Sequence, residues 1–418
     1  MNWQSFRALF LNQRFILGIY IAAAIITSVQ LYLIGPHPFR MPSPSEIPAD
    51  IMNRPELMNQ FIGQSQTQYN NYTIFKCSWY HLIQSRNLYG IYPTQHWDFF
   101  KYSPTFALLM GLIAWLPDLI GLSIWNLLNV ITLFFAIRLL PFTSKTQCLL
   151  LWFIFNEMLT CLTNCQSNGI MCGLIIAAYG CMEQKKIFWA TLWLVLATYI
   201  KVYGAIGFCI FLFYPGKIRF LLYTFIWTAI FALLPLLVTT PQTLLWQYHN
   251  WASLMIADAS TATGLSVNGL LNSWLGIPNS KWITLAGVLL FILPLARFRL
   301  YTNLSYRLLL LAYMLIWVII FNHKAESPTY IIAVTGVGIA FWGNTVSRWR
   351  LALLCFVLVF TSLSTTDFFP PYLRSHFMQP YKIKVLPCII AWIVLFFDLM
   401  FLKNLSSGEK ENKILSVN

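Results

Sequence analysis

The feature that most constrains this chain is a series of long apolar runs separated by short loops that carry basic residues. The first run, Phe15 to Ile34, follows Arg7 and Arg14 and is long enough to span the roughly 30 Å apolar core of a bilayer. It has no small-residue cleavage site at its end, which favours a retained membrane helix over a removed signal peptide. Charged residues make up 10% of the 418 residues, against about 25% in soluble domains. The sequence therefore predicts an all-α, polytopic membrane protein.

The remaining apolar runs predict about 11 to 13 membrane helices in a single integral membrane domain, residues 1–402, followed by a cytoplasmic tail, residues 403–418. After the first run, the predicted segments are 105–117, 119–140, 147–163, 169–182, 187–200, 203–214, 220–239, 282–297, 304–321, 328–343, 349–363 and 386–402. Segment 105–117 is short enough to be re-entrant or oblique, and this restores a consistent alternation of sides. The positive-inside bias then predicts that both termini are cytoplasmic. The long outer regions are 35–104, 240–281 and 364–385.

The first outer region is predicted to contain an amphipathic helix that lies on the membrane surface. The helix ends at Asn87 and Gly90, and its apolar residues follow helical spacing at Tyr72, Phe75, Trp79, Leu82 and Ile83. The preceding residues, 35–68, are rich in proline and are expected to be irregular and then weakly helical.

Several classes of function are disfavoured by composition and by missing motifs. The net charge of +14 comes from small basic groups between apolar runs and forms no continuous stripe, so no nucleic-acid partner is expected. Of the nine cysteines only Cys77 lies in a long loop, and no disulfide framework or metal-ligand spacing emerges. The sequence contains no Walker loop, GxGxxG, HExxH or GxSxG motif, so nucleotide hydrolysis, dinucleotide chemistry and these hydrolase classes are not supported. We predict no cofactor and no metal ligands.

Costly polar residues fall at the predicted outer face, where they favour a binding site. Lys201, in ATYIKVYG, interrupts an apolar region and could bind a lipid-linked phosphate, or it could extend its amine to the interface. Gln166 and Asn168, in NCQSNG, could hydrogen-bond a polar ligand or form a polar turn between helices. His323 and Glu326 are three residues apart and could orient a phosphate or sugar hydroxyl, or cap the following helix.

Asp98 is the outer-face carboxylate best suited to act as a general base. A base that removes a proton from an acceptor hydroxyl needs a carboxylate or imidazole within hydrogen-bond reach. Neighbouring aromatic residues would raise the pKa of Asp98 and Lys101 would lower it. The alternative is a surface aspartate paired with Lys101.

A series of short motifs, in order KYSPTFALL, CQSNG, ATYIKVYG and NGLLNSWLG, resembles the family 87 glycosyltransferases. The resemblance covers most of residues 14–345. It implies a GT-C fold and a polyprenyl-phosphate sugar donor, typically of mannose or arabinose. It assigns Tyr102, Gln166 and Asn168 to the site, associates Lys201 with the donor phosphate, and adds weight to His323.

The resemblance also exposes a departure at the position of the family's expected base. NNYTIF matches the stretch in which relatives carry an aspartate, and Asn71 occupies that position. Asparagine cannot accept a proton in that role. Either Asp98 substitutes, or Glu56 or Asp50 reaches the site, or the activity is changed or lost. Asn71 also begins an N-glycosylation sequon.

The sequence thus predicts a cell-membrane glycosyltransferase with its active site on the outer face. It would move a sugar, with mannose favoured, from a polyprenyl-phosphate donor to a hydroxyl of a glycan or glycolipid acceptor, with inversion and with membrane lipid around it. The alternatives are a transporter or flippase of lipid-linked sugars and a catalytically inactive scaffold of the same fold.

Overall fold

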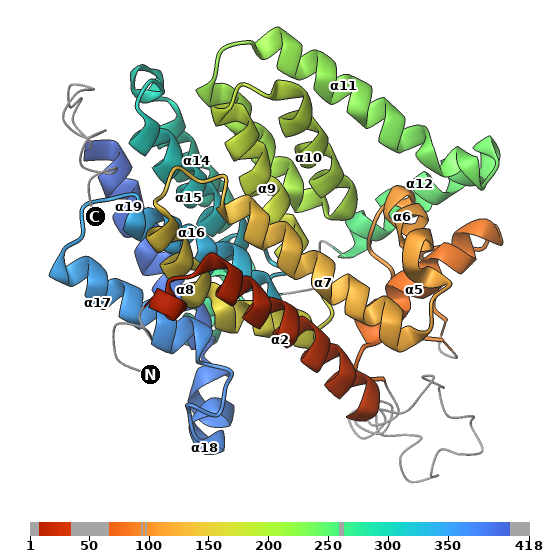
Figure 1. Cartoon of the computed structure of the whole chain (residues 1–418), viewed down its shortest axis with the longest axis horizontal. Coiled ribbons are helices and arrows are strands. Elements are labelled where there is room, and N and C mark those ends of the chain that lie inside the picture. Colours follow the sequence, from red (N-terminus) through yellow and green to blue (C-terminus); the bar gives the residue numbers. More distant parts are fainter. Residues whose placement is uncertain (1–7, 35–66, 93–94, 97, 259–262, 402–418) are drawn as a thin grey trace.

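Helices make up the structure of this chain, and its described residues contain no strand. The computed structural model describes residues 8–34, 67–92, 95–96, 98–258 and 263–401 (Figure 1). The α-helices are α2 (Gln13–Ile34), α5 (Asn70–Ile83), α6 (Pro104–Ala114), α7 (Asp118–Ile137), α8 (Ser144–Thr163), α9 (Asn168–Glu183), α10 (Ile187–Ile200), α11 (Lys217–Leu233), α12 (Pro241–Asp258), α13 (Val267–Leu275), α14 (Lys281–Leu295), α15 (Leu304–Ile320), α16 (Tyr330–Trp342), α17 (Arg348–Val357), α18 (Pro371–Leu373) and α19 (Leu386–Phe401). The 3₁₀ segments are η2 (Val202–Phe213), η3 (Leu234–Leu237), η4 (Phe298–Leu300), η5 (Ser327–Thr329) and η8 (Ile383–Val385), and the π segments are η6 (Leu358–Ser362) and η7 (Arg374–Met378).

The prediction of an all-α polytopic membrane protein is confirmed. Within the described residues, helical segments long and apolar enough to cross a membrane are Gln13–Ile34, Asp118–Ile137, Ser144–Thr163, Lys217–Leu237 and Ile383–Phe401, and shorter apolar helices include α9, α10, α15 and η2. With 11 residues, α6 is about 17 Å long and cannot cross a bilayer core of about 30 Å by itself. The number of crossings, the sides of the termini and the boundary between 1–402 and the tail stay predictions. Residues 35–66 and 402–418 lie outside the described residues.

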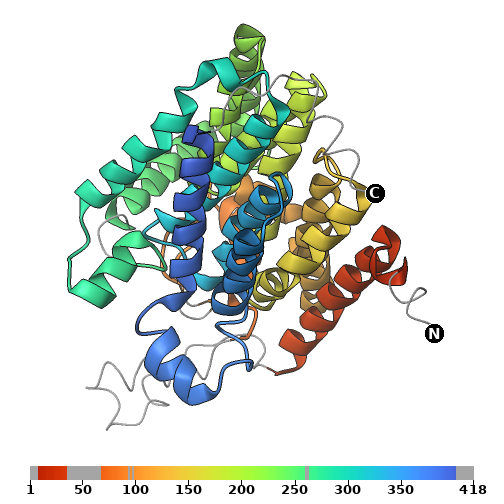
Figure 2. The same cartoon turned by 90° about the vertical axis from the view of Figure 1, so that its left-hand side faces the viewer.

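The centre of the assembly is the pair α15 and α16, which other helices surround (Figures 1 and 2). Every residue of α16 from Tyr330 to Ile339 is buried, and so is most of α15. A helix that is apolar on all sides needs helical neighbours on all sides. Here α8 and α9 contact α16 from the N-terminal half of the chain, while α19 contacts α15 from the C-terminal end.

Small residues allow α7 and α9 to approach closely. A Cβ atom on Gly173 would lie 2.8 Å from the backbone of Thr132, and one on Gly180 would lie 2.5 Å from Leu139 Cβ. Small residues at such contacts are typical of packing between membrane helices, where backbones meet without large side chains between them. These contacts hold the middle and the end of α9 against α7 and the residues that follow it.

The segment predicted as a helix at 203–214 is a 3₁₀ helix of 12 residues, η2. A 3₁₀ helix rises about 2.0 Å per residue, so η2 covers about 24 Å where an α-helix of that length would cover about 18 Å. With three residues per turn, one face repeats every third residue, and the buried residues of η2 are Gly204, Gly207, Ile210 and Phe213. Runs of this length are uncommon, and here the period-three face packs against α10 and α9.

The predicted amphipathic helix is present as α5, but it ends at Ile83 and not at Asn87 and Gly90. The prediction of its buried face was correct in part: Tyr72, Phe75 and Leu82 are buried, whereas Ile83 is 40% exposed. The helix packs on α6, and Lys76 forms a 2.6 Å ion pair with Asp118 at the start of α7. The turn after Ile83 occurs early because Ser85 adopts a φ of 55°.

The other two regions that were predicted to lie outside, 240–281 and 364–385, contain helical segments in their described residues. The first contains α12 and α13, and the second contains α18, η7 and η8. The more polar helix α12 was not expected as a membrane segment, and it is not among the long apolar helices.

A charged network joins α9, η2 and α15 at the end of α9. Arg307 donates from Nε and Nη2 to the two carboxylate oxygens of Glu183, both at 2.8 Å, and the hydroxyl of Tyr214 donates to Glu183 Oε1 at 2.6 Å. Bidentate arginine–carboxylate pairs are geometrically specific. The network therefore fixes the ends of three helices relative to one another.

Candidate active site

Two polar turns meet at the end of the assembly opposite this network. One is NCQSNG, residues 164–169, between α8 and α9, and the other is Lys201, between α10 and η2. Lys201 Nζ donates to Gln166 Oε1 at 3.2 Å and to Asn168 Oδ1 at 2.9 Å. Since α9 packs against α10 and η2, the backbone holds both amides around the ammonium group.

Two tyrosines flank this ammonium group. Lys201 Nζ lies 5.6 Å from the ring centroid of Tyr102 and 5.8 Å from that of Tyr203, distances at which a ring face attracts a cation. The hydroxyl of Tyr102 donates to Gln166 Oε1 at 3.3 Å, and that of Tyr203 donates to Asn168 Oδ1 at 2.9 Å. The four polar side chains and the lysine form one connected cluster, which we call the Lys201 cluster: Tyr102, Gln166, Asn168, Lys201 and Tyr203.

Within the part of the chain that the structure describes, the positive charge of the Lys201 ammonium is not neutralised by a carboxylate hydrogen-bonded to it. Burial lowers the pKa of the Lys201 ammonium to about 8, while the charge of Glu326 raises this pKa and that of Lys101 lowers it. The hydrogen-bond acceptors of Lys201 are neutral amides. A partly buried ammonium held by neutral groups is suited to receive an anion, because the anion supplies the missing countercharge.

A second donor in the cluster is not used. Asn168 is fully buried, and its Nδ2 group has no hydrogen-bond partner among the described residues. A buried N–H without a partner is costly, and such groups call for an explanation. Here it lies on the same amide that accepts hydrogen bonds from Lys201 and Tyr203.

The segment 98–104 brings a carboxylate to this region. Asp98 is exposed and has a φ of 99°, a backbone region that residues other than glycine rarely adopt. Its side chain accepts from the amide of Phe99 at 2.7 Å and lies 3.5 Å from Lys101 Nζ. Ser103 Oγ donates to the carbonyl of Tyr199 at 2.5 Å, which attaches the segment to the end of α10 two residues before Lys201. Burial raises the pKa of the Tyr102 hydroxyl, and the charge of Asp98 adds a smaller contribution in the same direction.

The loop that carries His323 and Glu326 lies beside residues 264–265. Gly264 N donates to the carbonyl of His323 and Leu265 N donates to that of Ala325, both at 2.7 Å. Gly264 is required here because a Cβ atom would lie 2.6 Å from the Ala325 oxygen. Glu326 is exposed, and its charge acts on Lys201, Tyr102 and Tyr203. The negative charge of Glu326 raises the pKa of the Lys201 ammonium, against the effect of burial.

Asn71 lies close to the same polar turn but is occupied by a hydrogen bond. Its Nδ2 group donates to the carbonyl of Asn164 at 2.8 Å, which connects α5 to the end of α8. Glu56 and Asp50, the other residues considered as a base, lie outside the described residues.

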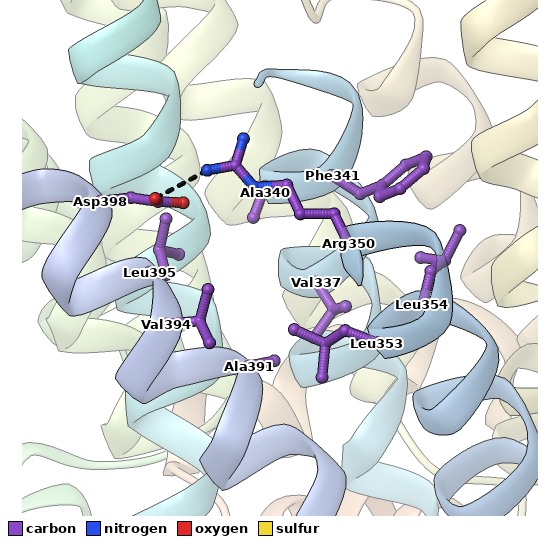
Figure 3. Close-up of a pocket in the computed structure, with 10 residues that line it drawn as sticks. All are labelled: Val337, Ala340, Phe341, Arg350, Leu353, Leu354, Ala391, Val394, Leu395 and Asp398. Atoms are coloured by element: carbon purple, nitrogen blue, oxygen red, sulfur yellow. Dashed lines mark hydrogen bonds and ion pairs between the residues drawn. The ribbon is translucent and has the colours of Figure 1, made fainter. Parts of the chain in front are cut away.

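The sequence analysis did not identify Tyr203 as a site residue. Its position two residues after Lys201 in IKVYG could have indicated it, because the backbone of Lys201 is extended and residues two apart in extended backbone point to the same side. The sequence analysis also gave no hint of the apolar pocket between α16, α17 and α19, where Arg350 Nη2 pairs with Asp398 Oδ1 at 2.7 Å (Figure 3). This pocket is at the end of α16 away from Tyr330 and is distinct from the Lys201 cluster.

In the described part of the chain no group of three or more histidine, cysteine or acidic side chains could hold a metal ion.

The helical fold and the polar cluster at one end of it are compatible with a membrane glycosyltransferase. A sequence model of Glycosyltransferase family 87 matches residues 99–362, which is more than half of the chain. The chain therefore belongs to glycosyltransferase family 87, as the motifs had suggested. No curated protein matches the sequence significantly. The matched range begins at Phe99, one residue after Asp98. It contains the whole Lys201 cluster and the loop with His323 and Glu326.

Proposed function

We propose that this membrane glycosyltransferase transfers a sugar, with mannose favoured, from a polyprenyl-phosphate donor to a hydroxyl of a glycan or glycolipid acceptor at the outer face of the cell membrane. The observation that carries the proposal is the Lys201 cluster, in which a partly buried ammonium is held by neutral amides. A polyprenyl-phosphate sugar combines an apolar chain for the membrane with one phosphate anion at its surface.

The cluster would hold the donor phosphate. Lys201 supplies the positive charge, and the unused Nδ2 group of Asn168 is a second donor for a phosphate oxygen. Hydrogen bonds between charged groups are about twice as strong as neutral ones, and a partly buried site strengthens them further. Tyr102, Gln166 and Tyr203 would hold these two donors in place, and His323 and Glu326 would border the sugar.

The reaction would be a single displacement. The acceptor oxygen forms a bond to the anomeric carbon while the bond from that carbon to the phosphate oxygen breaks, and the electron pair remains on the phosphate. Because the phosphate is a stable anion, Lys201 stabilises its developing charge and no general acid is needed. The acceptor proton passes to the Asp98 carboxylate, with Lys101 beside it, and the anomeric configuration inverts.

Asp98 is favoured over Asn71 as the base because Asn71 has no carboxylate and its amide is bound to Asn164. The backbone of Asp98 supports this role, since unfavourable φ values in non-glycine residues persist where the surrounding structure imposes them, often at functional sites. Glu326 is the second carboxylate whose charge reaches the Lys201 cluster, so it must be tested beside Asp98.

The test uses purified protein in lipid nanodiscs with short-chain polyprenyl-phosphate mannose and arabinose, each with a radiolabelled sugar. We expect one donor to be consumed and a new glycosidic bond to form, with the anomeric configuration inverted by NMR. Lys201→Ala should raise the KM for the donor about 10- to 100-fold, since a charged hydrogen bond contributes about 1.5–3 kcal/mol. Asp98→Asn should lower kcat about 10²- to 10⁴-fold.

The control is Lys217→Ala, which removes an exposed lysine at the other end of η2, where Lys217 Nζ lies 4.7 Å from the ring of Phe211. It should leave the transfer rate unchanged. Full activity of both Lys201→Ala and Asp98→Asn would refute the assigned roles, whereas a loss in Glu326→Gln alone would move the base to Glu326. Transport of intact donor in proteoliposomes without a new bond would favour the transporter, and absence of donor binding would favour the inactive scaffold.

A further inference from the structure

The most deeply buried ion pair among the described residues joins two parts of the chain that are far apart in sequence. Glu157 of α8 and Lys384 of η8 lie 2.7 Å apart, and their side chains are 0% and 4% exposed. The carbonyl of Lys384 accepts a hydrogen bond from Thr361 at 2.8 Å, which fixes the backbone around it. Lys384 lies beyond residue 362, where the family match ends.

Lys384 connects this pair to α16. Its Nζ lies 5.4 Å from the ring centroid of Tyr330, the first residue of that helix. The hydroxyl of Tyr330 donates to the carbonyl of Leu265 at 2.9 Å. Tyr330 is fully buried. Its ring contacts Lys384, and its hydroxyl binds the backbone of Leu265.

The contacts continue from Leu265 to the candidate site. Leu265 N donates to the Ala325 carbonyl, in the loop that carries His323 and Glu326. A second lysine of the same C-terminal segment, Lys382, donates to the carbonyls of Thr263 and Gly264, the latter at 3.2 Å. The C-terminal segment 382–384 therefore contacts the pairing between 264–265 and 323–325 from two points.

We propose that Lys384, held by Glu157, and Tyr330 are positioning residues that fix segment 263–265 and, through it, the loop that carries His323 and Glu326. The placement of this segment follows from the contacts alone, and only its importance for sugar transfer rests on the proposed function. The C-terminal part of the chain would thus support a site whose own residues lie between Asp98 and Glu326.

A purely stabilising role predicts a different outcome. Removing one partner of a buried ion pair is strongly destabilising because the other charge remains buried, whereas replacing both partners with apolar residues is often neutral. If the pair serves stability alone, Glu157→Leu/Lys384→Met should restore both stability and activity. If it positions Tyr330, stability should return while the site remains loosened.

The first test is Tyr330→Phe, which keeps the ring beside Lys384 and removes only the hydrogen bond to Leu265. Hydrogen exchange of the Gly264 and Leu265 amides, measured without substrate, should become about fivefold faster or more, the factor for one ordinary hydrogen bond. Tyr306→Phe is the matched control, because Tyr306 is also fully buried and its hydroxyl also donates to a backbone carbonyl, that of Pro294 at 2.7 Å. It should leave the two amides unchanged.

The second test compares Glu157→Leu/Lys384→Met with wild type in thermal unfolding, hydrogen exchange and kinetics. We expect a melting temperature near wild type, faster exchange at Gly264 and Leu265, and a kcat for sugar transfer below that of wild type. Unchanged exchange in both Tyr330→Phe and the double variant overturns the proposal. Wild-type protein that transfers no sugar would instead defeat the proposed function, while the exchange data would still decide the positioning.

Discussion

Lowering the pH from 7 to 5 should open the segment that carries Asp98, because this segment packs on buried histidines. His96 is 2% exposed, and its Nδ1 lies 3.0 Å from the carbonyl of Asp98. A carbonyl only accepts, so Nδ1 must carry the proton and the neutral ring donates it. The ring of His81 lies 6.1 Å from that of His96, and Gln95 Oε1 lies 2.6 Å from His81 Nε2. The ring of His81 is hydrogen-bonded to an amide oxygen and that of His96 to a backbone carbonyl, so a second proton on either ring would be poorly compensated.

The magnitude follows from the pKa of His96. Burial, and then the charge of His81, lower this pKa from 6.5 to about 4, although the Asp98 carbonyl and carboxylate oppose the shift. Burial also lowers the pKa of His81, against the hydrogen bond that its ring donates to Gln95 Oε1. The opened segment therefore binds more protons than the closed one between pH 6.5 and 4, and the closed form loses stability as the pH falls through this window. At pH 5 the loss from His96 is about 2 kcal/mol, or about 30-fold in the opening equilibrium.

Hydrogen exchange at the amides of His96 and Phe99, corrected for the intrinsic effect of pH, measures this opening. Their N–H groups donate to the Tyr92 carbonyl and the Asp98 carboxylate in the closed form. His96→Gln retains a donor but cannot titrate, so it should remove most of the gain in exchange between pH 7 and 5. The exposed histidine variant His376→Gln should behave as wild type. An equal gain in wild type and His96→Gln would refute the reasoning.

Three further perturbations test the site and its supports. The KM of wild-type enzyme for the donor should rise as the pH passes about 8, where Lys201 loses its proton, and a flat profile from pH 7 to 10 in initial-rate assays would contradict this. Gly204→Ala places a Cβ 2.7 Å from the Ala197 backbone and should cost about 1–3 kcal/mol in unfolding while weakening donor binding, as thermal melts and binding titrations would register. Arg307→Leu leaves Glu183 without its bidentate partner and should destabilise by about 3 kcal/mol, whereas a melting temperature equal to wild type would show that this network adds nothing.

Much of the fold follows from local sequence patterns, but the geometry of individual segments does not. The apolar runs and basic loops were sufficient for an all-α membrane protein. The 3₁₀ form of η2 was not predicted, because over 12 residues a period of 3.0 and one of 3.6 share many positions, and both place Gly204 and Gly207 on one face. The end of α5 was missed because its last turn depends on Ser85, a residue that rarely adopts positive φ.

In the candidate site, too, some residues could be predicted from local sequence and others could not. Gln166, Asn168, Tyr102 and Lys201 lie in short motifs, so they could be named from the sequence although their roles stay proposals. The buried position of Lys384 could not be predicted, because a lysine at the start of an apolar helix is expected to extend to the membrane interface. Its partner Glu157 is also 227 residues away in the sequence. Pairings of this kind depend on tertiary packing and leave no periodic signal.

The asparagine at position 71, where the family resemblance led us to expect an aspartate, has a physical explanation that is compatible with an active enzyme. The Nδ2 group of Asn71 donates to the carbonyl of Asn164, two residues before Gln166, and so attaches α5 to the turn that holds the Lys201 cluster. A carboxylate there could not donate, and it would meet the carbonyl oxygen with repulsion. An Asn71→Asp variant should therefore loosen this turn rather than supply a better base, and its kcat should fall unless a base at position 71 takes over from Asp98. If instead Asn71→Asp restores transfer to an Asp98→Asn enzyme, the base belongs at position 71 and the assignment of Asp98 is wrong.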